Sequence, residues 1–595
     1  MNPETKNCQN CKKDFTIESE DFQFYGKIKV PPPTFCAECR LQRRLSWRNM
    51  RSLYRRPCDL CKKEVIGMYA PDKPFKVYCT KCWWGDGWDG LEYGRAYDPG
   101  RPFFEQLKDL MQEVPRVNRF VYEDTMVNSD YTNMANSLKN CYLVFNSGGK
   151  FTACESCIYG EALTSATDCV DAAYLLQSQL CNRSVNLQHS YRVFYSKDCE
   201  SCRDSYFLDN CANCENCFGC VNLRNKKYHI FNEAYSKEGY FEKLKELGFT
   251  PGFYKGLLEL QKRSEELRVK APHRYMHGVH NVNSSGDYVF DSKDTRHGFH
   301  VDGAENTKFC AYIIPPLKDS YDFTQYGDGA ELTYEMLQSG EGVYNNHFGW
   351  CIWRQTKNSE YCMLQNGSSD CFGSIGLKNK RFCILNKQYS EDEYKTLRLK
   401  IIDDMNARPF IDRQKKEYRY GEFFPQDLCP FAYNETTAQE FFPLTKEEAV
   451  SKGYVWADKE KFKRKYTQTI SASDLPDSIE ETPDSILKEI IGCADCGAVY
   501  QIIPKELDFY RSNKLPLPRT CLECRYIERI MMRNPPRLWR RICQCAGIHS
   551  LNNVYQNTVA HTHGDAPCKT EFETSYAPDR PEIVYCEQCY QQEVV

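Results

Sequence analysis

Short apolar segments separated by polar residues fill the centre of the chain and predict many short strands. Between about 140 and 233, the segments CYLVFN, AYLLQ, YRVFY and YFLDN alternate with Cys, Asn, Asp and Ser. Similar segments, DYVFD, FCAYII and GWCIW, recur between 277 and 386. Recurring β-rich units with polar turns are typical of a solenoid, in which each unit stacks on its neighbour. We therefore predict two β-solenoid halves.

Cysteines in the first predicted solenoid recur at a fixed interval, which supports this prediction. Neighbours 12 residues apart are Cys157, Cys169 and Cys181, then Cys199 with Cys211, and Cys202 with Cys214. The interval of 18 between Cys181 and Cys199 indicates that units vary in length. We expect the small side chains to form internal ladders.

The three-residue spacing of Cys211, Cys214, Cys217 and Cys220 offers an iron–sulfur cluster or a further zinc site as an alternative. A second copy of this segment argues for stacked side chains instead. The segment CFGCVNLRNKKYHIFNEAYSKEGYFEK (217–243) aligns with CFGSIGLKNKRFCILNKQYSEDEYKTL (371–397), and Gln365, Ser368 and Ser374 replace three of the cysteines. The duplication also relates the two predicted solenoid halves.

Helices are predicted between and after these halves. A helix is expected at about 101–113, and Thr250-Pro251 begins another that ends near Val269. Ser390 with Glu393 and Thr445 with Glu448 have the spacing of capping boxes, and Ser236 is a predicted N-cap. The Ser/Pro-rich acidic segment 471–488 is predicted to be a linker.

Length and charge narrow the class of protein. With 595 residues and 41 % hydrophobic residues, the chain should form several folded domains. Its net charge of −3 excludes a globally basic nucleic-acid coat. The sequence contains no apolar run long enough to span a bilayer and no signal-peptide core, so we expect a cytoplasmic protein without membrane contact. Because the cytosol keeps thiols reduced, the 34 cysteines point first to metal binding.

Paired CxxC knuckles at both ends predict four zinc ribbons. Two knuckles supply the four thiolates that a tetrahedral structural zinc site requires. The four predicted ligand sets are Cys8, Cys11, Cys36 and Cys39; Cys58, Cys61, Cys79 and Cys82; Cys493, Cys496, Cys521 and Cys524; and Cys543, Cys568, Cys586 and Cys589. About four Zn²⁺ ions are therefore expected.

The C-terminal ribbons are a second copy of the N-terminal ones. CAECRLQRRLSWRNMRSLYRRPC (36–58) aligns without gaps with CLECRYIERIMMRNPPRLWRRIC (521–543) at a constant offset of 485. In the fourth ribbon, a 22-residue insertion separates Cys543 from Cys568. Cys545, His561 and His563 lie in this insertion and are competing ligands, because zinc accepts both imidazole and thiolate.

Several segments resemble an uncharacterised bacterial family of zinc-ribbon, cysteine-rich repeat proteins. The resemblance runs nearly end to end and rests on CAECRLQRRLSWRN, MYAPDKPFKVYCTKCWW, GRPFFEQLKDLMQEVPR, CFGCVNLRNKKYHIFN and FAYNETTAQEFFPLTKEEA. It supports the predicted architecture and implies no activity.

The basic helix of each end module gives the best functional lead. Arginines four residues apart share one face of a helix, and zinc-supported arginines beside an aromatic residue suit contact with phosphate and bases. The predicted nucleic-acid-binding residues are Arg40, Arg44, Arg48, Arg55 and Arg56, and their duplicates Arg525, Arg529, Arg533, Arg540 and Arg541. The alternative is that these arginines pair with acidic residues inside the protein.

The chain contains no P-loop, dinucleotide-binding, HExxH or GxSxG motif. The histidines at 273, 277, 280, 297 and 300 could form a metal or acid–base site, or cap the repeat units. We expect a non-enzymatic, zinc-stabilised binding protein whose partner is RNA, DNA or a nucleoprotein. A protein-interaction scaffold that uses the solenoid face and an enzyme with its site on the solenoid are the alternatives.

The predicted fold class is mainly β and multidomain. The expected order is zinc ribbon 1 with its basic helix (1–57), zinc ribbon 2 (58–100), a helical connector (101–135), solenoid half 1 (136–236), a second connector (237–276), solenoid half 2 (277–389), a helical or irregular region (390–470), the acidic linker (471–489), zinc ribbon 3 with its basic helix (490–542) and zinc ribbon 4 (543–595).

Overall fold

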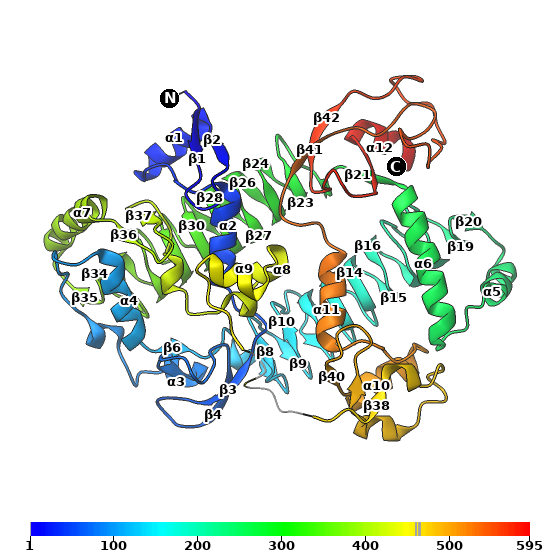
Figure 1. Cartoon of the computed structure of the whole chain (residues 1–595), viewed down its shortest axis with the longest axis horizontal. Helices are drawn as coiled ribbons and strands as arrows, with labels where there is room; N and C mark the ends of the chain where they lie inside the picture. The colour runs from blue at the N-terminus through cyan, green and yellow to red at the C-terminus, as the bar shows by residue number, and fades with distance from the viewer. Residues whose placement is uncertain (1, 459–460, 462–465) are drawn as a thin grey trace.

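Parallel strands dominate the computed structural model of this chain, which describes residues 2–458, 461 and 466–595 (Figure 1). The strands gather mainly in two stacks, and two terminal modules with the cysteine clusters complete the molecule. The first stack is the segment 126–234 and the second stack is the segment 278–388. Part of the region predicted at 390–470 lies outside the described residues.

The N-terminal module (residues 2–117) consists of short hairpins and helices. Its elements are β1 (Glu4–Asn7), β2 (Asp14–Ile17), α1 (Ser19–Ile28), α2 (Ala37–Leu45), β3 (Tyr54–Pro57), β4 (Glu64–Gly67), β5 (Val77–Tyr78), α3 (Thr80–Trp84), α4 (Phe103–Glu113) and β6 (Arg116–Val117).

The first stack pairs its strands in parallel, most of them with the strand one unit earlier in the chain. Its elements are β7 (Met126–Val127), β8 (Thr132–Asn133), β9 (Leu138–Lys139), β10 (Val144–Phe145), β11 (Cys154–Glu155), β12 (Glu161–Thr164), β13 (Val170–Leu176), β14 (Asn182–Gln188), β15 (Tyr191–Phe194), β16 (Lys197–Glu200), β17 (Arg203–Tyr206), β18 (Glu215–Phe218), β19 (Lys227–Ile230) and the antiparallel β20 (Glu233–Ala234).

From β12 onward the register of this stack is constant, including the place where we expected it to vary. Val170 lies opposite Asn182, and Leu187 lies opposite Cys199, so both pairs have the same offset as Cys157 and Cys169. Cys199 therefore continues the column of Leu187, not that of Cys181. The predicted irregularity between Cys181 and Cys199 is wrong because the two cysteines belong to different columns of equal units.

A three-residue backbone rhythm underlies this constant register. From Ser156 to Phe231, every third residue has a left-handed φ between 45° and 65°. The residue that follows each of these is in most cases buried, and those that are apolar form one cluster containing Cys169, Ala172 and Leu175. Each unit thus makes four turns and presents four short inward side chains, which explains why small residues recur.

The second stack follows the same plan, with offsets between parallel paired strands of 11 to 13 residues. Its elements are β22 (Gly278–Val279), β23 (Gly286–Phe290), β24 (Lys293–Arg296), β25 (Gly298–Asp302), β26 (Ala304–Lys308), β27 (Ala311–Ile314), β28 (Leu317–Gly327), β29 (Ala330–Glu331), β30 (Tyr334–Ser339), β31 (His347–Trp353), β32 (Met363–Asn366), β33 (Ser369–Phe372), β34 (Arg381–Ile384) and the antiparallel β35 (Lys387–Gln388). Gly286 of β23 lies opposite Gly298 of β25, which is the offset of the first stack. Tyr321 of β28 lies opposite Tyr334 of β30, so the unit has become one residue longer there.

Helices follow each stack. Between the stacks lie α5 (Lys237–Glu246), α6 (Tyr254–Lys270) and β21 (Pro272–Arg274); after the second stack lie α7 (Glu391–Ala407), β36 (Phe410–Ile411), β37 (Glu417–Tyr418), α8 (Ala438–Phe441) and α9 (Lys446–Ser451). The predicted capping box of Ser390 and Glu393 is present at α7, and that of Thr445 and Glu448 at α9. Ser236 caps α5 as predicted.

The C-terminal module (residues 470–595) repeats the N-terminal plan. Its elements are β38 (Ile470–Ser471), β39 (Ile491–Gly492), β40 (Val499–Tyr500), α10 (Pro504–Ser512), α11 (Leu522–Met531), β41 (Trp539–Ile542), β42 (Glu571–Thr574), β43 (Ile583–Tyr585) and α12 (Glu587–Val594). The acidic segment expected to be a linker is packed, because Leu475, Ile479 and Ile486 are buried in one apolar cluster with α10.

The two modules exchange their neighbours. Helix α2 of the N-terminal module contacts β28 and β30 of the second stack, whereas α11 of the C-terminal module contacts β13 and β14 of the first stack. Figure 1 shows both helices near the middle of the molecule, each crossing the strands of the stack that lies farther away in sequence. Each terminal module therefore packs a helix against the stack that is farther from it in sequence.

Candidate metal centres and the arginine contacts

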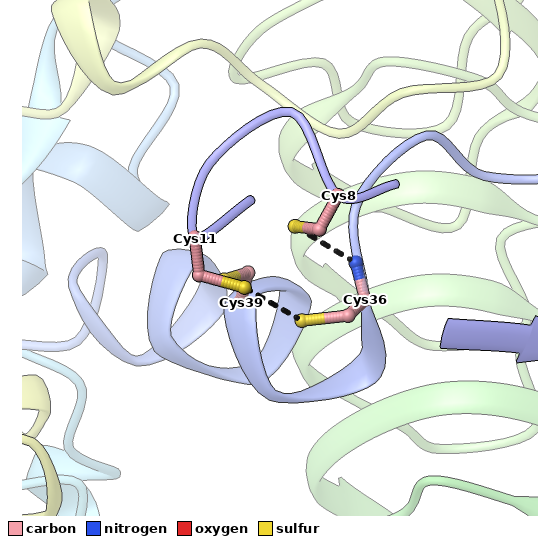
Figure 2. Close-up of side chains that lie close together, drawn as sticks. All are labelled: Cys8, Cys11, Cys36 and Cys39. Carbon is pink, nitrogen blue, oxygen red and sulfur yellow. Dashed lines mark hydrogen bonds between the residues drawn. The ribbon is translucent and has the colours of Figure 1, made fainter. Parts of the chain in front are cut away.

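The first cysteine set is assembled by a hairpin and a helix start. Cys8 follows β1, Cys36 is the N-cap residue of α2, and Cys39 lies in the first turn of that helix. The four ligand atoms of this set lie within 4.8 Å of one another, and Figure 2 shows the sulfurs turned toward a common centre. The amide of Cys36 donates to Cys8 Sγ at 3.3 Å. Amide donors and the positive end of a helix both favour the thiolate that a metal requires.

The second and third sets repeat this local geometry. Cys79 caps α3 and its amide donates to Cys58 Sγ at 3.2 Å, while Cys521 caps α11 and its amide donates to Cys493 Sγ at 3.2 Å. Hydrogen bonding from the backbone at Lys63 lowers the pKa of Cys61 to about 7. Burial opposes ionisation of Cys493, but backbone donors lower its pKa to about 7. Burial and neighbouring thiols raise the pKa of Cys82 in the second set and of Cys524 in the third, so one thiol of each set ionises most readily.

The fourth set and the insertion form two adjoining groups. Cys543, Cys568, Cys586 and Cys589 are all buried and come together as predicted. Cys545, His561 and His563 do not displace any of these ligands; they form a second group in which Cys589 is the fourth member. The structure therefore brings all sixteen predicted metal-ligating cysteines into four sets.

The cysteines of the stacks have a different environment. Among the described residues, no group of metal-ligand atoms includes Cys211, Cys214, Cys217 or Cys220. Their sulfurs lie near backbone carbonyls instead: Cys217 Sγ is 3.6 Å from the carbonyl oxygens of Glu215 and Lys226. Ser184 Oγ makes the equivalent contacts at 3.0 and 3.2 Å. A thiol and a hydroxyl therefore fill the same kind of position.

Most of the histidines predicted as a candidate site near the second stack pack against aromatic side chains. Tyr288 is stacked between His277 and His300, with ring centroids 4.5 and 4.6 Å away. His297 stacks on Phe309, His273 packs against Tyr576, and the His280 side chain is exposed. In the described part of the chain they form no common metal group.

The arginines of α2 face inward, contrary to the expected basic stripe. Arg40 and Arg44 are 2 % and 0 % exposed, and both contact Asp322, at 2.8 and 2.9 Å. Arg44 also reaches Glu335 at 2.7 Å. Arg48 is buried as well. Arg40 and Arg44 do share one face of α2, and that face lies against the second stack because buried carboxylates pair with it. Arg48 lies beyond the end of α2 at Leu45, so the expected stripe of three arginines on one helix is wrong.

The arginines of α11 repeat the arrangement on the first stack. Arg525 and Arg529 both contact Asp171, at 2.5 and 2.8 Å, and Arg525 also contacts Glu506 at 2.9 Å. Burial alone would raise the pKa of Asp171, but the two guanidinium groups hold it below its usual value. Arg533 lies beyond the end of α11 at Met531; it is buried, and its guanidinium lies 4.2 Å from the ring centroid of Tyr174.

The remaining predicted nucleic-acid-binding residues divide by exposure. Arg55 and Arg540 are exposed, Arg541 is half-buried, and Arg56 is buried with an ion pair to Asp59 at 3.2 Å. The expected continuous basic surface is therefore absent from these ten residues. Of these ten, only Arg540 and Arg55, which also donates to Tyr131 Oη, are exposed enough for a phosphate to reach them.

The sequence analysis did not predict several other residues that take part in these buried arginine contacts. Arg43 contacts Glu335 at 2.7 Å and Glu422 at 3.1 Å, and Arg51 stacks on Tyr526 of the other module. The carboxylates gave a usable signal: Asp171, Asp322 and Glu335 stand inside apolar strand segments. All three occupy left-handed positions of the three-residue rhythm.

Charged residues line one open hollow of the described structure. It has a volume of about 350 Å³ beside α7 and is bordered by Glu360, Asp370, Arg381 and Arg398. Arg398 pairs with Glu360 at 2.6 Å. Such mutual pairing satisfies the charges without a ligand.

Comparison of the chain with protein-family models, curated proteins and solved structures gives no match. In the parts of the chain that the structure describes, every helix is too short or too polar to cross a bilayer.

Proposed function

We propose that this protein is a non-enzymatic, zinc-stabilised scaffold whose terminal modules clamp two β-solenoids together and whose solenoid faces bind protein partners. The observation that carries this proposal is the burial of the arginine faces of α2 and α11 against carboxylates of the two stacks. These helices serve as internal clamps, so the surface available to a partner is that of the stacks.

Zinc is the metal that suits the four cysteine sets. Each set offers four sulfur ligands at a common centre, which matches the tetrahedral, all-thiolate coordination of structural zinc. A CxxC turn at a helix N-terminus recurs in all four sets. Because the ligands come from separate hairpins and helices, metal binding and module folding are one process.

A solenoid architecture is supported by the register and the backbone rhythm. Nearly equal parallel offsets, such as Val170 to Asn182 and Tyr321 to Tyr334, recur through the two stacks. Left-handed residues recur at every third position from Ser156 to Phe231. Such units bury a continuous narrow core and expose long flat faces. Faces of this kind suit extended protein partners.

Free thiols are consistent with a cytoplasmic site of action. All 34 cysteines lie in the described part of the chain and are unpaired, and those of the stacks are buried near backbone carbonyls. A reducing compartment keeps such thiols available for zinc and for core packing.

Protein partners are favoured over nucleic acid because of the cost of exposing the arginines. A phosphate could reach Arg44 only if its contacts with Asp322 and Glu335 were broken. Removing one partner of a buried ion pair costs about 3–5 kcal/mol, more than one phosphate contact returns.

The test is recovery of the native full-length protein from cells, with and without nuclease, followed by cross-linking of the bound partners. We expect the same protein partners in both samples, with cross-links to residues 126–388. Partners that disappear with nuclease, or cross-links confined to the terminal modules, would overturn the proposal.

A direct titration with RNA and DNA at low salt gives the second readout. A dissociation constant of about 10 µM or tighter that weakens in an Arg55→Glu, Arg540→Glu variant would favour nucleic acid instead.

A further inference from the structure

The fourth ribbon and its insertion together bring more metal-ligand side chains into one place than one metal ion can use. Seven side chains gather there: Cys543, Cys545, His561, His563, Cys568, Cys586 and Cys589. They form two groups of four that share Cys589. We propose that this ribbon holds two zinc ions joined by a bridging Cys589 thiolate, so that the insertion builds a metal site of its own.

The donor count supports two ions. Two tetrahedral ions need eight ligand positions. Six side chains that bind one ion each, and one thiolate that binds both, fill those eight positions. A thiolate sulfur has enough lone pairs to bind two cations, whereas a neutral imidazole nitrogen has one, so the shared member should be a cysteine. Cys589 is the residue at that place.

Each histidine presents its free nitrogen to a cysteine sulfur. His561 Nδ1 lies 3.0 Å from Cys545 Sγ, and His563 Nε2 lies 3.3 Å from Cys589 Sγ. The opposite ring nitrogens face acceptors: His561 Nε2 is 3.2 Å from Glu593 Oε2, and His563 Nδ1 is 2.8 Å from the carbonyl oxygen of Ala566. An acceptor holds the proton on the nitrogen nearest to it, which leaves the other nitrogen free to bind a metal.

The position of Glu593 distinguishes this group from side chains that merely pack together. The side chains of His561 and Glu593 are both 0 % exposed. Glu593 Oε1 also accepts from Tyr555 Oη at 2.8 Å and from the amide of Thr558 at 2.8 Å. A buried carboxylate behind a histidine is the usual outer partner of a zinc ligand, because it orients the ring and makes its free nitrogen more basic.

The insertion places hydrogen-bond donors around the sulfur of Cys545, as a metal-binding thiolate requires. The amide of Gly547 and Nδ2 of Asn557 both point at Cys545 Sγ, at 3.5 and 3.2 Å, which stabilises a thiolate. Gly547 has φ +89°, and a Cβ at this position would lie 2.4 Å from the carbonyl oxygen of Gly564. The tight turn that aims these donors therefore needs glycine.

The first copy of the module provides the matched control. There, Cys58 and Cys61 are separated only by Asp59 and Leu60, and the equivalents of Cys545, His561 and His563 do not exist. Replacing residues 544–567 by Asp-Leu should convert the fourth ribbon into an ordinary four-thiolate site. This exchange removes the second ion without touching Cys543, Cys568, Cys586 or Cys589.

The experiment is zinc analysis and native mass spectrometry of the full chain and its variants. We expect five zinc ions per chain, one for each group. Cys545→Ser and the Asp-Leu exchange should each lose one ion, and Cys589→Ser should lose two. His549→Gln, in the same insertion but outside both groups, should lose none. Four ions in the unmodified chain, or unchanged zinc in Cys545→Ser, would overturn the second site.

The bridge has a test that needs no substitution. In the full chain reconstituted with ¹¹³Cd, two of the cadmium resonances should show a scalar coupling to each other, because they share the Cys589 sulfur. Five uncoupled resonances would overturn the bridge. Failure of the scaffold proposal would leave these results unchanged, since metal content and cadmium coupling do not depend on any partner.

Discussion

At the scale of single residues, the arginines show what a sequence pattern can and cannot specify. The spacing of Arg40 and Arg44 predicted correctly that they share a helix face. It could not show that Asp322 lies opposite, because that carboxylate is far away in sequence and comes close only in the folded chain. An arginine stripe has the same periodicity whether it faces solvent or buried carboxylates.

Loss of Arg44 should therefore destabilise the fold. In Arg44→Met, Asp322 and Glu335 lose a guanidinium partner inside the protein, and we expect unfolding to become easier by about 3–5 kcal/mol. Arg55→Met is the control, because Arg55 is exposed, and should stay within about 0.5 kcal/mol. Denaturant unfolding followed by circular dichroism measures both. Equal effects for the two variants would contradict the buried clamp.

Cysteines of the stacks should tolerate serine, unlike those of the modules. Cys217→Ser keeps a small donor near the carbonyls of Glu215 and Lys226, as Ser184 already does at its own position. We expect a cost of about 1–2 kcal/mol and no loss of metal. Cys36→Ser should release one zinc ion. Zinc analysis after gel filtration distinguishes the two outcomes, and metal loss from Cys217→Ser would refute the packing role.

Acid should destabilise the protein through His273. Burial, with Arg268 nearby, lowers the pKa of His273 to about 3, whereas an unfolded histidine has a pKa of about 6.5. The unfolded chain therefore takes up the proton first as the pH falls below about 6.5, and stability is lost toward pH 3. The loss at pH 5.5 is about 1.4 kcal/mol.

This contribution can be isolated by substitution. His273→Gln should show a smaller decline in unfolding free energy between pH 7.5 and 5.5 than the unmodified chain does. His280→Gln, at an exposed histidine, should follow the unmodified chain. Parallel pH profiles for all three proteins would show that His273 does not titrate as its surroundings imply.

At the scale of elements, local signals were predicted well and the choice of neighbours was not. The capping boxes at Ser390 and Thr445 and the CxxC turns depend on residues close in sequence, so their spacing alone identified them. Helix α2 contacts the second stack and α11 contacts the first. These contacts depend on packing between residues far apart in sequence, so no local sequence pattern predicted them. The constant register from β12 onward was hidden because Val193 and Ser205, not cysteines, continue the column of Cys181.

The exchange of stacks predicts a crossed response to metal loss. Cys36 caps α2 and Cys521 caps α11, so each serine variant should loosen one helix. Cys36→Ser should speed amide hydrogen exchange in β28 and β30 and leave β13 and β14 protected, and Cys521→Ser should do the reverse. The two variants control for each other. Faster amide hydrogen exchange in the stack that is nearer in sequence to the substituted module would show that each module stabilises its nearer stack instead.

At the scale of the whole molecule, the crossed contacts make the two halves depend on each other. A fragment of residues 1–276 would keep the first stack but lack α11, and a fragment of residues 277–595 would keep the second stack but lack α2. Asp171 would then lose both of its arginines in the first fragment, and Asp322 both of its arginines in the second. Unpaired buried carboxylates and uncovered apolar surface should leave each fragment poorly folded alone.

Together, the two fragments should assemble into one particle. We expect them to co-purify when produced in the same cell, with the zinc content of the intact chain, and to remain largely insoluble when produced separately. Arg44→Glu in the first fragment should abolish assembly, because it places a third carboxylate beside Asp322 and Glu335. Arg55→Glu, at an exposed position, should leave assembly intact. The contrary outcome is that residues 1–276 fold alone, with the same protection of β13 and β14 from amide hydrogen exchange as in the intact chain. That result would show that the stacks do not need the crossed contacts of the terminal modules to fold.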